Sequence, residues 1–417
     1  MAPGRTSKHH RLWTFSSAAA LLAAVAMGAG ACGSGTRSAS AGACDSPGVT
    51  PTQIHLGLLY PNTGPSAPGL AASRAGVDAR IGLANASGGI NGRKIVYEWR
   101  DDQDNPTANA TAARYLVEQS KVFGILEFTA VSAGSAQYLT DRDVPVGGLS
   151  IGGAWANHPN MFTIGPTTSS AIDLFGNYVR NQGASKAFVL TTALSAISGD
   201  ASTSFAASFR AAGVQIVDRS AFTAGVDDPS VIAQRVARSG ADTLLLVING
   251  NSVPTMMKAI RAGAPNLRVV LSLSGYDKQV LAQAGGAMAG VEIPLYFRPF
   301  EAGGPSIDTF RRGMTEFAPE VSDTDQQLAL ISYIDTDLFL RGLQAAGPCP
   351  TRASFMSGLR ATSNYDAGGL ITPFNIARDL HKQITCWSFV RGNASGTAFD
   401  VAGDNLCGHE LPAGAGG

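Results

Sequence analysis

Short apolar runs typical of β-strands alternate along this chain with longer segments of helical periodicity. Ile54 to Tyr60 forms the first such run, and residues 69–86 follow it with apolar positions at helical spacing. The same alternation predicts strands over 94–99, 122–128, 187–192, 214–219, 243–248 and 268–273, and helices over 105–119, 201–212, 229–239 and 254–262. Alternation on this scale indicates parallel sheets with helices on both faces.

The alternation runs twice, over residues 54–163 and 187–290, without a clear low-complexity linker between the runs. After residue 290 the pattern changes to a long helix over 326–346, an extended segment over 368–374 and a late strand over 385–390. The elements after residue 290 are expected to pack against both lobes, so the chain would cross between the lobes several times. Several such crossings make a hinge. We therefore predict an α/β fold of two Rossmann-like lobes with parallel sheets, joined by a multi-strand hinge.

The expected boundaries follow from this division. Lobe 1 comprises residues 49–165 and 296–375, lobe 2 comprises 166–295 and 376–408, and 409–417 form a disordered tail.

The first 31 residues have the features of a signal peptide: a basic start, an apolar run over 18–27 and small residues before Cys32. The apolar run is too short for a membrane span, which needs about twenty residues. Ala29-Gly30-Ala31-Cys32 resembles a bacterial lipobox, although that motif usually has Leu where Ala29 stands. The resemblance implies lipid attachment at Cys32, with residues 32–48 as a flexible tether; a plain secreted form is the alternative.

The charge balance changes little when the signal peptide is removed. Lys and Arg together number 31, as do Asp and Glu; without residues 1–31 the formal net charge is −3, from 28 basic and 31 acidic residues. Such a chain lacks the basic surface that nucleic acid requires, and no nucleic-acid partner is expected.

Cysteine use agrees with export. Besides Cys32 the chain has four cysteines, and an even number in an oxidising compartment favours two disulfides over four buried thiols. A zinc site is not expected, because no CxxC or HxxxH spacing occurs.

Several motifs identify the chain as similar to a known family. The stretch 88–94 (GGINGRK) and the stretch 99–106 (WRDDQDNP) closely resemble the type I periplasmic-binding-protein family, in particular its leucine/isoleucine/valine- and amide-binding branch. Residues 61–64, 365–369 and 333–347 resemble other parts of that family, so the similarity extends from about Val49 to Val390. The resemblance implies a lipoprotein that closes around a small molecule and then docks to an ABC permease in the membrane.

Two of these stretches have a physical explanation that does not involve ligand. In GGINGRK the glycines end a helix and Asn-Gly makes a tight turn into the next strand. Asp101 to Asp104 lack the spacing of an EF-hand calcium loop, so we expect a solvated turn.

The candidate site lies where parallel strands end, because ligands of open α/β sheets bind beyond the carboxyl ends of strands. This rule nominates the loops 62–66, 128–131, 150–153, 194–199, 249–252 and 274–277. Within these loops, and partly by analogy with the family, the predicted ligand-binding residues are Thr63, Phe128, Thr129, Ser150, Ile151, Gly152, Ser198, Asn249, Tyr276 and Asp277.

The family resemblance implies roles for some of these residues. A hydroxyl at Thr129 or Ser150 with neighbouring amides would hold a carboxylate. Asp277 would hold an ammonium group, or would instead cap the following helix. Tyr276 would wall the pocket or pack elsewhere. Residues 197–199 lack the aromatic side chain that the family often has there, and this departure removes the ring that would cover a branched-chain amino acid.

The resemblance also bears on disulfide pairing, because helices in such lobes run outward from the cleft. Cys349 follows a long helix and Cys44 precedes the first strand, so both should lie at the outer edge of lobe 1. Cys386 and Cys407 flank a possible late hairpin. The favoured pairs are therefore 44–349 and 386–407.

No arrangement typical of catalysis is present: the histidines are scattered, and neither GxSxG nor GxxxxGK[ST] occurs. We therefore predict a non-enzyme without cofactor or metal. The expected protein is a monomeric, extracytoplasmic solute-binding lipoprotein of an ABC importer, anchored to the outer face of the membrane, for a small polar ligand of the amino-acid or amide type. A receptor subunit for a membrane kinase and an extracellular hydrolase on a similar fold are the alternatives.

Overall fold

The computed structural model describes residues 44–151, 153–165, 170–193, 196–263 and 266–412, and all of them belong to one compact unit, Ala41–Gly417. The predicted signal peptide and Cys32 lie outside the described residues. No helix in the described ranges has the length and apolar character needed to cross a membrane.

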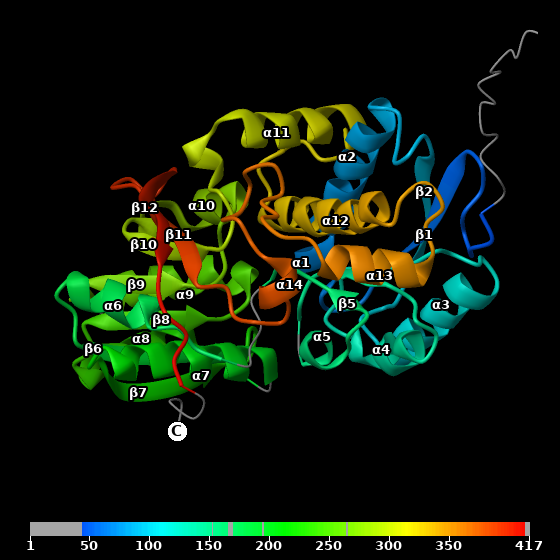
Figure 1. Ribbon diagram of the computed structural model, residues 1–417. Helices are drawn as coiled ribbons and strands as arrows, with labels where there is room; N and C mark the ends of the chain where they lie inside the picture. The colour runs from blue at the N-terminus through cyan, green and yellow to red at the C-terminus, as the bar shows by residue number, and fades with distance from the viewer. Residues whose placement is uncertain (1–43, 152, 166–169, 194–195, 264–265, 413–417) are drawn as a thin grey trace, which may run out of the picture. The chain divides into compact units, whose positions relative to one another are not determined.

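Lobe 1 contains a wholly parallel sheet of five strands in the order β2-β1-β3-β4-β5. Its strands are β1 (Gln53–Tyr60), β2 (Lys94–Asp101), β3 (Ile125–Glu127), β4 (Val146–Gly148) and β5 (Met161–Phe162). The helices between them are α1 (Ala67–Leu70), α2 (Ala72–Ala86), α3 (Pro106–Glu118), α4 (Ala133–Thr140) and α5 (Ala154–Asn157). Later in the chain α11 (Pro305–Phe317), α12 (Gln327–Ala345) and α13 (Arg352–Arg360) return to this lobe, where α11 and α12 pack against α2 (Figure 1).

Lobe 2 contains a sheet of seven strands in the order β12-β11-β10-β9-β8-β6-β7. Its parallel strands are β6 (Lys186–Thr192), β7 (Gln215–Phe222), β8 (Thr243–Val247), β9 (Val269–Ser272) and β10 (Val291–Leu295). The late hairpin of β11 (Cys386–Gly392) and β12 (Phe399–Cys407) adds two antiparallel strands. The helices of this part are α6 (Leu174–Asn181), α7 (Ala196–Ala211), α8 (Pro229–Ser239), α9 (Val253–Gly263) and α10 (Lys278–Ala284), and short 3₁₀ turns lie at η1 (Gly250–Ser252), η2 (Gly285–Met288) and η3 (Phe300–Ala302). The short helix α14 (Ile376–Asp379), which precedes the hairpin, contacts α13 of lobe 1.

The predicted fold class of two lobes with mainly parallel sheets is confirmed, and local signals explain many of the element boundaries. Asn105 caps α3 by accepting hydrogen bonds from the amides of Thr107 and Ala108, and Pro106 follows at the first helical position. Gly240 ends α8 in the left-handed conformation, with φ of 68°.

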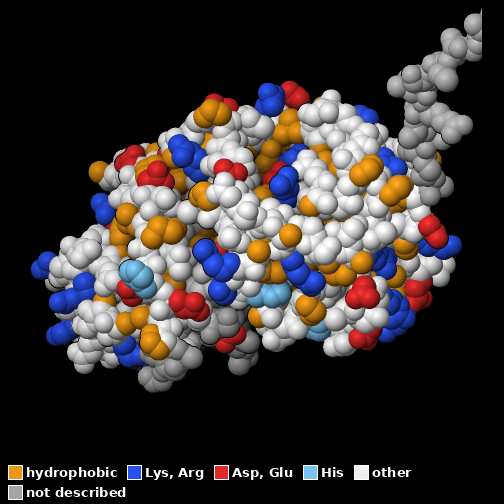
Figure 2. All heavy atoms as spheres, viewed as in Figure 1, with side chains coloured by type: hydrophobic (Ala, Val, Ile, Leu, Met, Phe, Trp, Pro, Cys, Tyr) orange, Lys and Arg blue, Asp and Glu red, His pale blue; other side chains and the backbone are white. Residues whose placement is uncertain are grey.

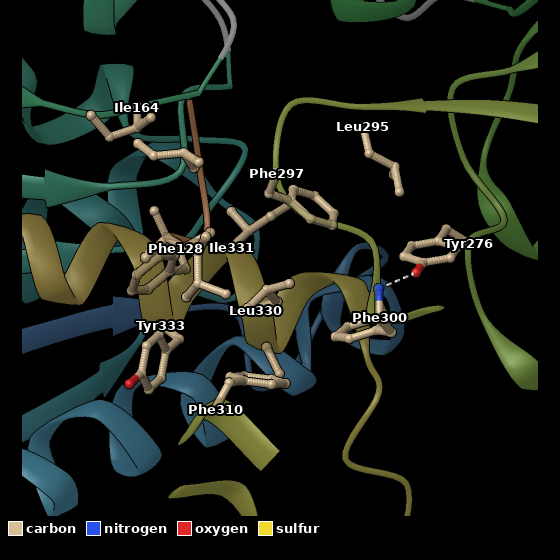
Figure 3. Packing of buried hydrophobic residues seen from close by; sticks show 14 of the residues in the cluster. Phe128, Ile164, Tyr276, Leu295, Phe297, Phe300, Phe310, Leu330, Ile331 and Tyr333 are labelled. Carbon is tan, nitrogen blue, oxygen red and sulfur yellow. Dashed lines mark hydrogen bonds between the residues drawn. The ribbon is translucent and has the colours of Figure 1, made fainter. Parts of the chain in front are cut away.

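The chain passes between the two sheets three times, and each passage contacts α12 or the helices beside it. The amide of Ile164 donates to Asp335 at 3.3 Å, and the hydroxyl of Tyr365 donates to Asp337 at 2.8 Å. In the remaining passage Phe297 and Phe300 are buried in the same cluster as residues of α12 (Figure 3). This cluster joins residues of both lobes, so the hinge is part of the hydrophobic core.

Both disulfides have the pairing that the sequence favoured: Cys44 with Cys349, and Cys386 with Cys407. The side chain of Arg93, from the GGINGRK stretch, donates to the carbonyls of Thr50 and Pro348 and to Sγ of Cys44. This stretch precedes β2, so it stabilises the edge of lobe 1 opposite to the carboxyl ends of the strands.

Two expectations near the C-terminus were wrong. Residues 368–374 are not an extended segment: they begin in a turn in which the carbonyl of Asp366 accepts from three following amides, and only Phe374 pairs, with Tyr365. The expected disordered tail does not include His409 to Leu411, because the backbone there is hydrogen-bonded to residues 171–173.

The face of the protein shown in Figure 2 carries both basic and acidic side chains over each lobe. This mixture agrees with the balanced charge of the sequence.

The contact between α2 and α12 leaves no room for a side chain at Gly76, because a Cβ atom there would lie 2.0 Å from the carbonyl oxygen of Ala329. We expect Gly76→Ala to lower the free energy of unfolding by about 3 kcal/mol, the upper range for an overpacked core. Urea denaturation followed by circular dichroism measures this. Gly69→Ala is the matched control, since a Cβ there has no neighbour within 4 Å. Equal effects of the two substitutions would contradict the packing described.

Candidate functional site

The carboxyl ends of four strands of lobe 1 lie side by side. Tyr60 pairs with Asp101, and Glu127 lies in register with Leu59 on one side and Gly148 on the other. The loops that follow β1, β3 and β4 therefore meet at one edge of the sheet, as the sequence predicted. Every described candidate residue of lobe 1 lies in these loops.

The turn after β2 shapes the loop after β1. Asp101 accepts hydrogen bonds from the amide of Asn62 at 2.9 Å, the amide of Thr63 at 3.3 Å and the hydroxyl of Thr63 at 2.7 Å. Asp104 likewise accepts from the amide and the hydroxyl of Ser66. The expected turn is present and Gln103 is exposed, but Asp102 is buried and the carboxylates of Asp101 and Asp104 position residues 62–66. Partial burial opposes ionisation of Asp101, but the hydrogen bonds outweigh it and lower its pKa.

A buried polar cluster lies beneath the loop after β3. Oε1 of Glu127 accepts from the side-chain amide of Asn109 at 2.8 Å and from the hydroxyl of Ser135 at 3.1 Å. The same amide donates to Asp102 at 3.2 Å. Glu127 is fully buried, and its Oε2 has no partner in the described part of the chain. Burial first, and then repulsion from Asp102, raises the pKa of Glu127 to about 7, although its two hydrogen bonds oppose the rise.

The side chains of the loop after β3 point inward. Phe128 and Thr129 are both fully buried. The hydroxyl of Thr129 accepts a hydrogen bond from the amide of Val131, and its own hydrogen bond to Asp102 favours the ionised form of that carboxyl. By contrast, the amides of Thr129, Ala130 and Ser132 donate to no acceptor among the described residues. Successive free amides before a helix suit an anionic group. The loop is thus better suited to bind through its backbone than through the Thr129 hydroxyl that the sequence suggested.

The loop after β4 is described only in part. Ser150 and Ile151 are half-buried, and the amide of Ile151 donates to the carbonyl of Leu149 at 3.0 Å. Gly152 lies outside the described residues.

Two candidates of lobe 2 follow β6 and β8. Ser198 is 7% exposed; its hydroxyl accepts from the amide of Thr192 and donates to the carbonyl of Val247, which joins the start of α7 to the ends of β6 and β8. Asn249 is exposed and makes no side-chain capping bond to the 3₁₀ turn that follows it. Of the two, Asn249 is the more accessible to a ligand.

The two candidates after β9 have structural roles. Tyr276 is 2% exposed and stacks on Phe300; its hydroxyl donates to Glu301 at 2.5 Å and accepts from the amide of Phe300 at 2.8 Å (Figure 3). Burial, together with the charge of Glu301, raises the pKa of this phenol. Asp277 is half-buried and caps α10 by accepting from the amide of Gln279. The capping alternative for Asp277 and the packing alternative for Tyr276 are therefore observed.

Sequence reasoning missed an ion-pair cluster that links the lobes. Lys278, at the start of α10 in lobe 2, contacts Asp323 at 2.7 Å and Asp325 at 3.2 Å in the segment before α12. Arg311 of α11 also pairs with Asp325, at 2.7 Å. The partners are distant in the chain, so no local pattern could have revealed them.

A cavity of about 360 Å³ opens beside the loop after β1. Its walls include Tyr60, Asn62, Arg74, Asp78 and Glu320. Arg74 and Asp78 are both hydrogen-bonded to the hydroxyl of Tyr97, so these charges are already paired. Across the described ranges no three His, Cys, Asp or Glu side chains are grouped so as to hold a metal ion.

Comparison with known proteins gives a consistent result. A family model described as "Periplasmic binding protein" matches residues 53–397. No curated protein matches the chain.

Solved structures with the same fold include the fatty acid ABC transporter substrate-binding protein from Thermomonospora curvata, with a TM-score of 0.71, 18% identity and coverage of 87% of this chain and 94% of that one. The branched-chain amino acid transporter substrate binding protein from Streptococcus pneumoniae, in complex with isoleucine, has a TM-score of 0.69, 19% identity and coverage of 84% and 100%. A solute binding protein from R. palustris in complex with benzoate has a TM-score of 0.70, 17% identity and coverage of 87% and 98%. At these identities the likeness is one of fold.

Because Asp101 holds the loop after β1, we expect Asp101→Asn to loosen that loop while the sheet stays intact. An amide in place of one carboxylate oxygen cannot accept every bond that the carboxylate accepts. Hydrogen exchange followed by mass spectrometry should show faster exchange, by about tenfold for a lost hydrogen bond of roughly 1.4 kcal/mol, in peptides covering residues 61–66. Asp141→Asn, at an exposed position of the same lobe, should leave these peptides unchanged. Unchanged exchange in Asp101→Asn would contradict the role described.

Proposed function

Because the chain belongs to the periplasmic binding protein family, we propose that it is the substrate-binding component of an ABC importer and captures a small molecule outside the cytoplasmic membrane. The observation that carries this proposal is the placement of loops at the carboxyl ends of two sheets, on lobes joined by three passages of the chain. The solved proteins of this fold named above are described as transporter binding proteins or as a solute binding protein, which supports the proposal.

The proposed mechanism is closure about the hinge. A ligand binds the half-site of one lobe, and contacts with the second lobe then favour the closed state by the free energy of those extra contacts. The closed protein docks to the permease. Such a protein needs no catalytic group and no cofactor, so we propose that it is not an enzyme and that it acts as a monomer.

The ligand is proposed to be a small polar molecule that carries a carboxylate, as an amino acid does. The free amides of Thr129, Ala130 and Ser132 support this, since they suit an anion. Isoleucine, valine, benzoate and 4-hydroxybenzoate, the ligands named for solved proteins of this fold, all carry a carboxylate. The proposed contacts are Thr63, the amides of the loop after β3, Ser150, Ile151, Gly152, Asn249 and Asp277. Phe128, Ser198 and Tyr276 would support these contacts from within the core.

We also propose that Cys32 carries lipid and holds the protein at the outer face of the membrane. The Cys44–Cys349 disulfide fixes the end of the proposed tether near the amino end of β1. This edge is opposite to the strand ends that carry the site, so the tether would leave the site accessible.

Ligand binding is expected to stabilise the protein, because a ligand selective for the native state at 100 times its Kd adds about 2.7 kcal/mol. A thermal-shift panel should contain branched-chain and aromatic amino acids, benzoates, short fatty acids and simple amides. We expect at least one carboxylate to raise Tm by several degrees and to reduce the radius of gyration in small-angle scattering. The primary amide of that compound serves as the control and should bind more weakly. If no compound in the panel changes either quantity, the proposed ligand class is wrong.

Lipid attachment is expected to be lost in Cys32→Ala. Cells expressing the full chain should incorporate labelled fatty acid into the protein, and Cys32→Ala should remove both the label and the membrane association. Cys44 follows a second Ala-Gly-Ala tripeptide, so the double variant Cys44→Ala/Cys349→Ala is the matched control and should keep the label. Label that persists in Cys32→Ala would show that the lipid is elsewhere.

A further inference from the structure

Glu127 is the last residue of β3 and directly precedes the loop proposed to bind the ligand. Its side chain is enclosed by α3 through Asn109, by α4 through Ser135, and by the turn after β2 through Asp102. It is fully buried, in the central strand of its sheet. A charge on this carboxyl would therefore act on the loop without screening by water.

The surroundings disfavour that charge. Within the described part of the chain, Glu127 interacts with no basic group. Its charged neighbour is another carboxylate, Asp102, which raises the pKa of Glu127. Both hydrogen bonds to Glu127 are accepted by Oε1, which leaves Oε2 unpartnered. An ionised oxygen without a donor is costly in an apolar interior, whereas a protonated one is tolerated much better.

Of the two carboxyls, Glu127 is the one that should hold the proton. Asp102 receives three hydrogen bonds, from the amide of Asp104, the side chain of Asn109 and the hydroxyl of Thr129. Glu127 receives two, and both residues are fully buried. More donors stabilise the ionised form, so Asp102 is the anion of the pair.

We propose that Glu127 is a neutral carboxylic acid in the ligand-bound protein, and that its proton determines the preference of the adjacent loop for an anionic ligand group. The inference rests on the proposed function, because it concerns the same half-site. A neutral Glu127 leaves the partial positive charge of the free amides of Thr129, Ala130 and Ser132 as the dominant local electrostatic feature. An ionised Glu127 would place a negative charge next to the loop and repel the ligand.

The direction of the pH dependence follows. The pKa of Glu127, about 7, lies above the ordinary value of a glutamic acid, so the group is neutral below pH 7 and ionised above it. Affinity for a carboxylate should be high and constant at low pH and should fall, by roughly tenfold, between pH 6 and 8.5. The folded state also binds this proton more tightly than the unfolded chain does, so stability should fall as the pH rises from the ordinary pKa of a glutamic acid to about 7 and should level off above that.

The binding test uses the carboxylate that gives the largest thermal shift, with benzoate as the first probe, titrated calorimetrically from pH 5.5 to 8.5. The natural chain should lose about tenfold in affinity across this range. Glu127→Gln is permanently neutral and of nearly the same shape, so it should keep the low-pH affinity throughout. Glu316→Gln, at an exposed position on α11, is the matched control and should follow the natural chain. A natural chain with constant affinity, or a Glu127→Gln variant that keeps the pH dependence, would overturn the inference.

A second measurement needs no ligand and separates the inference from the proposed function. Urea midpoints recorded against pH should fall as the pH rises toward about 7 in the unsubstituted protein and level off above it, and this fall should be absent in Glu127→Gln. In Asp102→Asn the negative charge that repels Glu127 is removed, so the pKa of Glu127 should decrease and the fall in the urea midpoint should end at a lower pH. If no carboxylate binds but the urea midpoints behave as described, the proposed ligand class is wrong, whereas the assignment of a proton to Glu127 is supported. If the urea midpoint depends on pH in the same way with and without Glu127→Gln, then Glu127 is not a neutral acid.

Discussion

The arrangement of both lobes depends on α12, because the chain passages between the sheets contact one short stretch of this helix or the cluster around it. Ile164 donates to Asp335, Tyr365 donates to Asp337, and Phe297 and Phe300 lie in the same buried cluster. Because α12 is buried along most of its length, it is a rigid element, and the three interlobe segments pack against it. Under the proposed mechanism, closure would change the angle between the lobes while α12 stays in place.

The loops at the strand ends are shaped by carboxylates of the protein rather than by their own sequence. Asp101 and Asp104 hold residues 62–66, and Asp102 and Glu127 lie under the loop after β3. Loops held in this way lose little freedom on binding, which favours affinity. The cost is the burial of acidic groups without basic partners, and a proton on Glu127 reduces that cost.

Charge also links the two lobes outside the proposed site. Lys278 begins α10 and reaches two aspartates before α12, one of which is also paired with Arg311. Lys278 is 60% exposed, so each pair contributes little to stability by itself. Such contacts are suited to adjusting the balance between open and closed states, because they can be exchanged for water at small cost.

The sequence by itself determined the elements of the fold, because their signals are local. Alternating periodicity identified most strands and the helices α2, α3, α7, α8, α9 and α12, Asn105-Pro106 and Gly240 marked helix ends, and cysteine positions together with the family resemblance indicated the pairing. Only the tertiary structure decided which polar residues are buried and with which partners. Asp101 was expected in a solvated turn, and Tyr276 was nominated for the ligand, yet both are occupied by contacts with residues 24 or more positions away. Burial and long-range hydrogen bonds arise from packing between distant segments, which periodicity and spacing do not encode.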